Sequence, residues 1–377
     1  MCKMKRLKSI DIIRGTSMLW MFLAHLMHWW LTLEDFWFYD AVFSILDVMG
    51  AGAFLFISGV STALSYRNRI VNMENSEIKS RKKIRNEYLF RASLLLLLAL
   101  IYNVPIAFYT RNPFNVWIWY ILLTIAISLF MAWPLLKVPK ILRICIAAGI
   151  WIANQYLITF LLPYKGHISL NGALFHVLYN GYPILDPILT FFPFFLMGTV
   201  VGDMISKIYQ KDNEKERRTV LKSHLVIPSL LSGACLIIIG VSLNFPDFLN
   251  SIQRSFSWMI YSLGVLLILL SVLLCIEEFD LIKTKRSYKF LFYYSYYSLT
   301  IFLAHNLLFF VFTRQLSASN IIFFVIGTTI LVGLLLRYMY PKLGGMISIK
   351  VQINRMSREL ARIVEERRNL DFTADNK

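Results

Sequence analysis

The sequence predicts an all-α fold, a polytopic transmembrane bundle of about ten helices with both chain ends in the cytoplasm. Three observations predict it. The 377 residues are 57% apolar, above the roughly 45–50% that is typical of soluble domains. Apolar runs of about 20 residues, the length that crosses a bilayer, recur along the chain. The Lys and Arg residues are concentrated in every second gap between these runs, as expected for a chain that crosses a membrane repeatedly.

The apolar runs give the predicted helices in order. They lie at about 12–33, 41–65, 88–110, 115–136, 141–163, 186–206, 224–244, 256–276, 290–313 and 320–341. The first run follows several basic residues, as the core of a signal peptide would. It is too long for a signal peptide, contains Arg14 and lacks a small-residue cleavage site, so we expect it to remain as the first helix.

The basic residues orient the bundle. With the N-terminus inside, 35 of the 39 Lys and Arg residues lie on the cytoplasmic side, and Arg111, Lys165, Arg254 and Arg314 lie outside. This bias follows the positive-inside rule and fits an even number of helices. The net charge of +17 therefore indicates topology rather than nucleic-acid binding, for which the sequence carries no motif.

Two segments between or after the runs are also expected to be helical. The longest outer loop, about 164–185, has room for a short re-entrant or interfacial helix. The tail after Pro341 is polar, and its apolar residues recur mainly at spacings of three and four: Ile349, Ile353, Met356, Leu360, Ile363 and Leu370. This pattern predicts an amphipathic helix on the inner leaflet or a short coiled coil. The predicted domains are thus a transmembrane domain, 1–341, and a cytoplasmic tail, 342–377.

Ionisable residues inside the predicted helices are the candidate functional residues, because a charge in a bilayer costs several kcal/mol. His25 and His28 lie in the first helix, Asp47 in the second and His305 in the ninth. At 1.5 Å per residue from the cytoplasmic helix end, His25 lies roughly 16 Å and His305 roughly 24 Å into the membrane. Both are expected in the outer half, as is Asp47. Imidazole is the usual general base for a hydroxyl or an amine, so an outward-facing site is predicted.

Each of these residues also has a structural interpretation. A histidine in a helix bundle is often a hydrogen-bonded packing residue. His28 precedes two tryptophans, which fits an interfacial aromatic belt, and Asp47 fits a simple partner for a histidine. Arg14 fits either a local ion pair with Asp11, three residues away, or a phosphate clamp at the cytoplasmic mouth.

Four stretches resemble a known enzyme family. In the first, Asp11 precedes the pair Arg14-Gly15, and ten residues separate Arg14 from His25. The others are 52–61 with 65–69, 192–198 with Gly202, and 297–305. Together they resemble the heparan-alpha-glucosaminide N-acetyltransferase catalytic-domain family of transmembrane acyltransferases, which is related to acyltransferase family 3.

The resemblance implies transfer of an acetyl group, or a longer acyl group, from cytoplasmic acetyl-CoA to an amine or hydroxyl of an extracytoplasmic sugar. His305 looks like the catalytic histidine of the family. His25 stands at the active-site position of the first helix, where a lysosomal member has Asn, so His25 is either a base or a hydrogen-bond partner. We predict direct transfer with His305 as the base, and an acetyl-histidine intermediate is the lesser alternative.

Further site residues are expected around the two histidines, and no metal is expected. Four are assigned to the donor site: Arg14, Asp11, Ser58 and Ser298. Three are assigned to the acceptor site: Asp47, Asp186 and His176.

The main alternative is a transporter or flippase of a polar or lipid-linked solute, which also places polar groups at mid-membrane depth. Pro105, Pro134 and Pro193 interrupt predicted helices, but no paired repeat is evident. The absence of an Asn-x-Ser/Thr sequon favours a multi-pass protein of a prokaryotic plasma membrane. The expected partners are acyl-CoA, a glycan or glycolipid acceptor and membrane lipid, with a homodimer as a further option.

Overall fold

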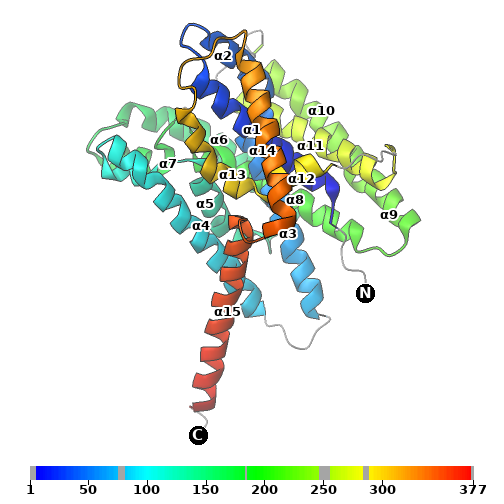
Figure 1. The fold of residues 1–377 in the computed structure, drawn as a ribbon. Helices are drawn as coiled ribbons and strands as arrows, with labels where there is room; N and C mark the ends of the chain where they lie inside the picture. The colour runs from blue at the N-terminus through cyan, green and yellow to red at the C-terminus, as the bar shows by residue number, and fades with distance from the viewer. Residues whose placement is uncertain (1–5, 75–80, 183–184, 246–254, 283–287, 375–377) are drawn as a thin grey trace. The chain divides into compact units, whose positions relative to one another are not determined.

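The computed structural model describes residues 6–74, 81–182, 185–245, 255–282 and 288–374, with the backbone alone at 74 and 368–374 (Figure 1). Every named element in these ranges is a helix. The described chain contains no strand, and its one β-bridge joins Leu31 to Leu316. The predicted all-α fold is therefore confirmed.

Seven helical segments of the described chain are long and apolar enough to cross a membrane. They are Phe36–Met73, Arg81–Tyr109, Lys140–Tyr164, Ile188–Tyr209, Glu214–Ser242, Phe256–Glu278 and Ile321–Leu343. The other three predicted spans correspond to α1 (Lys8–Trp30), α5 (Ile121–Leu135) and the apolar segment Ser298–Phe310. The first of these is long but carries several polar residues, and the other two are short. The number of crossings and the cytoplasmic location of the ends remain predictions.

The chain divides into two units. The first contains residues 1–58 and 207–350, and the second contains 59–206 and 351–377. The predicted boundary at residue 341 separates a membrane domain from a tail, and it remains a prediction.

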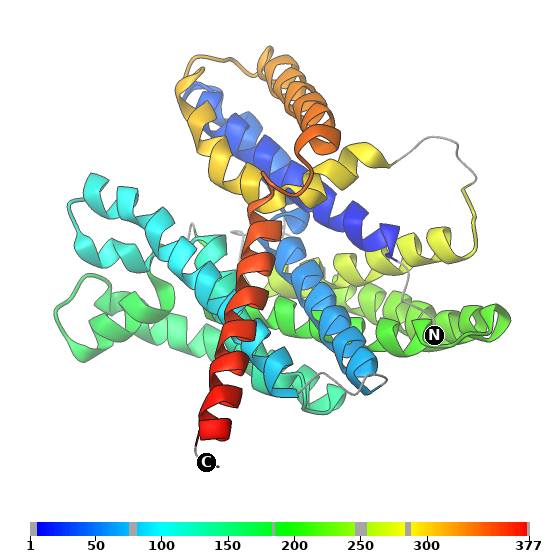
Figure 2. The ribbon, with the colours of Figure 1, turned by 60° about the horizontal axis from the view of Figure 1, so that its bottom comes forward.

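The first unit is organised around α1. Its other helices are α2 (Phe36–Leu46), η1 (Asp47–Met49), the start of α3 (Ala51–Glu74), α9 (Glu214–Leu221), η4 (Lys222–Val226), α10 (Ile227–Ser242), α11 (Phe256–Glu278), α12 (Lys289–Tyr296), α13 (Ser298–Ala304), η6 (His305–Phe310) and α14 (Ile321–Leu343). Contacts join α1 to α2 and to α11 through α14 (Figure 2). A Cβ at Gly15 would lie 2.2 Å from the carbonyl oxygen of Leu291, so the backbones of α1 and α12 touch, as small residues allow in membrane bundles.

Two predicted helices of the first unit are broken. The predicted helix 41–65 ends at η1, because Gly50 leaves the helical conformation with a ψ of −134° before α3 begins. The predicted helix 290–313 is divided into α12, α13 and η6. Tyr297 separates the first two pieces with a ψ of 16°, and its hydroxyl donates to the carbonyl oxygen of Gly344. Apolar periodicity does not reveal such breaks, since no proline marks them.

The second unit contains the remaining helices. They are the rest of α3, α4 (Arg81–Tyr109), η2 (Pro113–Trp117), α5, α6 (Lys140–Leu161), η3 (Leu162–Tyr164), α7 (Leu170–Tyr179), α8 (Ile188–Tyr209, to residue 206) and α15 (Ile349–Ala374, from residue 351). A Cβ at Gly59 would lie 2.0 Å from the carbonyl oxygen of Phe195, so α3 and α8 are in backbone contact. The short helix predicted in the outer loop is confirmed as α7.

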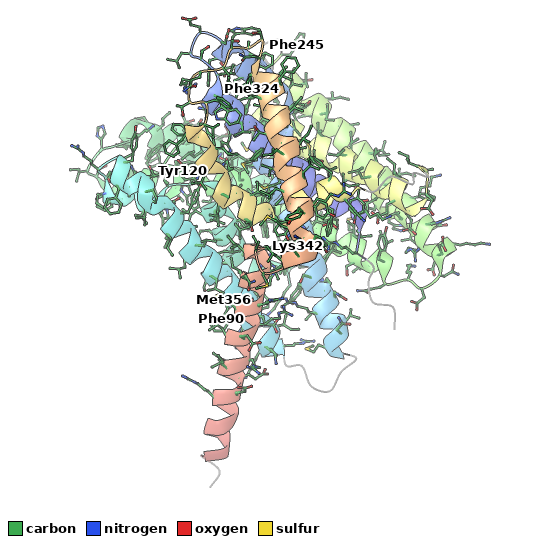
Figure 3. The ribbon with its side chains drawn as sticks, in the orientation of Figure 1. Phe90, Tyr120, Phe245, Phe324, Lys342 and Met356 are labelled. Atoms are coloured by element: carbon green, nitrogen blue, oxygen red, sulfur yellow. The ribbon has the colours of Figure 1, made fainter. Side chains whose placement is uncertain are left out.

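The polar tail is helical, as predicted. Along α15, Ile353 and Ala361 are buried, whereas Met356 (labelled in Figure 3) and Ile363 are exposed. The side chain of Leu370 lies outside the described residues. The apolar stripe is thus partly available for a lipid surface or a second helix, and the choice between these remains a prediction.

Candidate active site

The predicted meeting of His25 and His305 is confirmed within the first unit. Their ring centroids lie 4.9 Å apart, although one belongs to α1 and the other to η6. Trp29, one turn after His25, stacks on His25 at 5.3 Å and on His305 at 5.3 Å, with a 20° interplanar angle in each case. The three ring centroids therefore form a triangle, and each ring contacts the other two at a separation typical of attractive aromatic pairs.

Hydrogen bonds define which nitrogen of each histidine carries the proton. Nδ1 of His305 lies 2.5 Å from the carbonyl oxygen of Phe302. A carbonyl only accepts, so Nδ1 is the donor and Nε2 of the neutral ring holds the lone pair. Nδ1 of His25 lies 2.9 Å from Sδ of Met21, and a thioether is also an acceptor. The same tautomer follows for His25, and both rings are prepared to accept a proton at Nε2.

Backbone hydrogen bonds hold the two histidine segments together. The amides of Arg314 and Leu316 donate to the carbonyl oxygens of Trp29 and Trp30 at 2.9 and 2.8 Å. The indole of Trp30 donates to the carbonyl oxygen of Leu308 at 2.9 Å. The end of α1 is therefore joined directly to η6 and to the chain that follows it. These hydrogen bonds hold the cluster of His25, Trp29 and His305 rings in place, and no atom of either imidazole takes part in them.

His28 lies one turn beyond His25 and is enclosed by rings from α2. Its imidazole meets Phe36 at 5.3 Å and Tyr39 at 5.2 Å, both edge-on. Nδ1 and Nε2 of His28 are both buried, and within the described part of the chain neither has a hydrogen-bond partner. The expected position of His28 in an interfacial belt remains a prediction.

Asp11 lies in the first turn of α1, at the helix end that is predicted to face the cytoplasm. Nε and Nη2 of Arg6 donate to its carboxylate at 2.6 and 2.9 Å, and Oγ of Ser295 donates to it at 3.1 Å. The bond from Asp11 raises the pKa of Arg6 above its ordinary value. Arg14 lies 3.8 Å from Asp11, which confirms the predicted local ion pair. The carboxylate thus connects α1 with α12, and its assignment to the donor site remains a prediction.

The other predicted site residues are divided between the units. In the first unit, Asp47 is buried in η1, which contacts α1, Ser298 is buried at the start of α13, and Ser58 is half-buried in α3. In the second unit, a ring nitrogen of His176 lies 3.0 Å from the carbonyl oxygen of Phe114. The backbone of Asp186 pairs with Trp119 and Thr124. Of the assigned residues, His25 and His305 are thus in ring contact, and Arg14 pairs with Asp11.

Two features of the structure were not predicted from the sequence. Trp29 was not assigned to the site, although a residue four positions after His25 lies on the same helix face. In the second unit, Asp203 of α8 is buried and binds Arg67 at 2.7 Å through Nε and at 2.8 Å through Nη2. Arg143 also donates to Asp203. A carboxylate inside the apolar run 186–206 was the available signal for this cluster.

The family of the chain can now be established. The model for "Heparan-alpha-glucosaminide N-acetyltransferase, catalytic" matches residues 6–238, more than half of the sequence. The chain belongs to this family. A search of curated proteins found no match. The protein is therefore placed among membrane N-acetyltransferases, a family that uses acetyl-CoA as donor.

The match to the N-acetyltransferase family covers α1 through most of α10, and with it His25, His28 and Trp29. It ends before η6, so the case for His305 depends on its contact with His25 and not on the matched region. Among the described residues, no group of His, Cys, Asp and Glu side chains is arranged to hold a metal ion.

Proposed function

We propose that this chain transfers an acetyl group from cytoplasmic acetyl-CoA to an amine or hydroxyl of an extracytoplasmic sugar, with His305 as the general base. One observation carries the proposal. Two imidazoles from segments 280 positions apart in sequence share one cluster of rings with Trp29, inside a member of an N-acetyltransferase family. A buried His305 in contact with a half-buried His25, each with Nδ1 already engaged, suits proton transfer better than packing alone.

The proposed reaction is a direct acyl transfer. Nε2 of His305 accepts a proton from the acceptor while the acceptor nitrogen or oxygen attacks the thioester carbonyl. The resulting tetrahedral intermediate collapses, the carbon–sulfur bond breaks, and the CoA thiolate leaves and recovers the proton from His305. The products are the N-acetyl or O-acetyl sugar and CoA. Nε2 of His25, which carries a lone pair in the tautomer given above, is proposed to accept a hydrogen bond from the acceptor or to share its proton beside this path.

The donor is proposed to enter from the cytoplasmic end of α1. Arg14, largely buried beside Asp11, is the candidate for binding the phosphates of acetyl-CoA, with Ser58 and Ser298 along the path. Asp47 is proposed to contact the acceptor, and the assignment of Asp186 and His176 to the acceptor stays a prediction from the sequence. The protein is further proposed to lie in a prokaryotic plasma membrane and to act on a glycan or glycolipid.

Release of CoA tests this function. Purified protein in detergent is incubated with acetyl-CoA, with and without D-glucosamine as the amine probe, and free thiol and acetylated product are measured. An acetyltransferase releases CoA and yields an acetylated amine. A transporter or flippase, the alternative from the sequence, leaves acetyl-CoA intact, and that result would refute the proposal. Mass spectrometry of surface glycans and lipids with and without the protein then identifies the natural acceptor.

A further inference from the structure

We infer that His28 forms a second polar subsite on α1, which binds a hydroxyl or amine of the acceptor next to the catalytic pair. This inference rests on the proposed function and adds a residue that neither the sequence motifs nor the family match assigns to the acceptor. It starts from an unsatisfied side chain. Both ring nitrogens of His28 are buried, and neither has a hydrogen-bond partner among the described residues. Buried polar groups in native proteins are almost always paired, so these two nitrogens can take a hydrogen-bonding partner that the described chain does not supply.

The chemistry of imidazole defines the class of ligand. A neutral ring has one N–H donor and one nitrogen acceptor. A hydroxyl or a primary amine both donates and accepts, so it can satisfy either nitrogen of His28. A carboxylate or a phosphate only accepts, and it would leave the second nitrogen of a neutral ring unpaired. The unpaired nitrogens therefore favour a neutral, hydroxyl-rich or amine-bearing molecule.

The surroundings of His28 fit a molecule with apolar faces and polar edges. Phe36 and Tyr39 present aromatic rings at 5.3 and 5.2 Å. Binding sites for small molecules combine such apolar walls with a few polar groups that fix orientation. A sugar has carbon–hydrogen faces for the rings and hydroxyl or amine edges for the imidazole.

The position of His28 connects this subsite with the reaction. His28 follows His25 by three residues, roughly 4.5 Å along the helix axis, on the side predicted to face outward. A sugar bound there has neighbouring substituents within reach of the His25–His305 pair. The two rings over His28 belong to α2, and none of the 11 residues of that helix is buried. A helix with so little buried surface opens more readily than the core helices, which gives the acceptor a way in.

His28→Phe tests the inference, since phenylalanine suits an aromatic cluster but cannot pair with a hydroxyl. Wild-type and variant are purified in detergent, and KM is measured for D-glucosamine and for acetyl-CoA, together with the melting temperature without substrates. We expect KM for glucosamine to rise by about tenfold, the value of one hydrogen bond. KM for acetyl-CoA should stay within about twofold. The melting temperature should be unchanged or higher, because an unpaired polar group has been removed.

Two further variants make the result decisive. His28→Asn keeps a donor and an acceptor and should restore part of the affinity for glucosamine. His167→Phe makes the same substitution at an exposed histidine and should change neither KM nor the melting temperature. An unchanged KM for glucosamine in His28→Phe, or a lower melting temperature with equal loss for both substrates, would overturn the inference and leave the proposed function standing. A wild-type protein that releases no CoA would instead refute the proposed function.

Discussion

The two units each enclose a polar cluster among apolar helices, and the clusters use their polar atoms differently. In the second unit, the carboxylate of Asp203 binds both Arg67 and Arg143, and Nη1 of Arg143 donates to the hydroxyl of Thr199. In the first unit, His25 and His305 each use Nδ1 for one hydrogen bond, and His28 has both nitrogens unpaired within the described chain.

This difference separates a structural role from a chemical one. The Asp203 cluster neutralises its carboxylate, and among the donors of Arg143 only Nε is buried without a partner in the described chain. The cluster therefore holds helices in register and has less capacity for a substrate than the histidine cluster. The histidine cluster holds proton-accepting imidazoles in fixed positions. Among the described residues, no ion pair involves them. Burial of polar residues inside a membrane protein is therefore a weak guide to function, and the number of polar atoms still available is a better one.

The largest expected effect is on catalysis. Replacing His305 by alanine should lower acetyl transfer by a factor of about 10² to 10⁴, the usual contribution of a general base, while the amount of folded protein changes little. CoA release and size-exclusion chromatography measure the two quantities. His224→Ala, at an exposed histidine of η4, is the control and should be fully active. Retained transfer in His305→Ala would remove His305 as the base.

The next effect is on stability and concerns the other cluster. Asp203→Leu leaves the guanidinium groups of Arg67 and Arg143 without their shared carboxylate. Removing one partner of a buried ion pair typically costs about 3–5 kcal/mol, so the melting temperature in detergent should fall sharply. Glu359→Ala, which breaks an exposed ion pair with Arg362, should have almost no effect. A stable Asp203→Leu protein that has lost only its activity would reverse the comparison and make this cluster part of the site.

An intermediate effect is expected at Trp29. Trp29→Leu removes the ring that contacts both imidazoles, and small misplacement of a reacting group costs about tenfold to a hundredfold in rate. The loss should appear in kcat more than in KM for acetyl-CoA, with a modest change in stability. Trp37→Leu, at a tryptophan that is 62% exposed, is the matched control. A wild-type kcat in Trp29→Leu would show that the Trp29 ring does not position the two imidazoles.

The smallest effect separates the two roles considered for His25. Asn retains a hydrogen-bonding group, so His25→Asn should reduce transfer by less than about tenfold and by less than His25→Ala. Rates of CoA release for both variants at the same acetyl-CoA concentration give the comparison. Equal and large losses would instead indicate that protonation of the His25 ring is required.

The sequence predicted most of the fold because membrane helices are recognisable by apolar length. The interruptions at Gly50 and Tyr297 were missed, since each depends on local backbone angles that leave no trace in hydropathy. For the same reason, the sequence did not predict that the ninth helix changes to a 3₁₀ helix at His305. Short 3₁₀ stretches inside helices often occur at functional positions.

The site was only partly predictable for a related reason. Matching the depths of His25 and His305 required only the rise per residue of a helix, and the resulting contact was confirmed. The surroundings of His28 depend on which rings of α2 pack against it, and the interfacial belt position expected from the sequence remains a prediction. The Asp203 cluster combines helices α3, α6 and α8, so its assembly depends on packing rather than on any local pattern.

Transfer between two sealed compartments tests the central claim most directly. The purified protein is reconstituted into liposomes with D-glucosamine inside and acetyl-labelled acetyl-CoA outside, and labelled product is measured in each compartment. The account predicts labelled N-acetylglucosamine inside the liposomes for the wild-type protein and none for His305→Ala. Label that accumulates inside at the same rate in both proteins, or that never joins the amine, would contradict it.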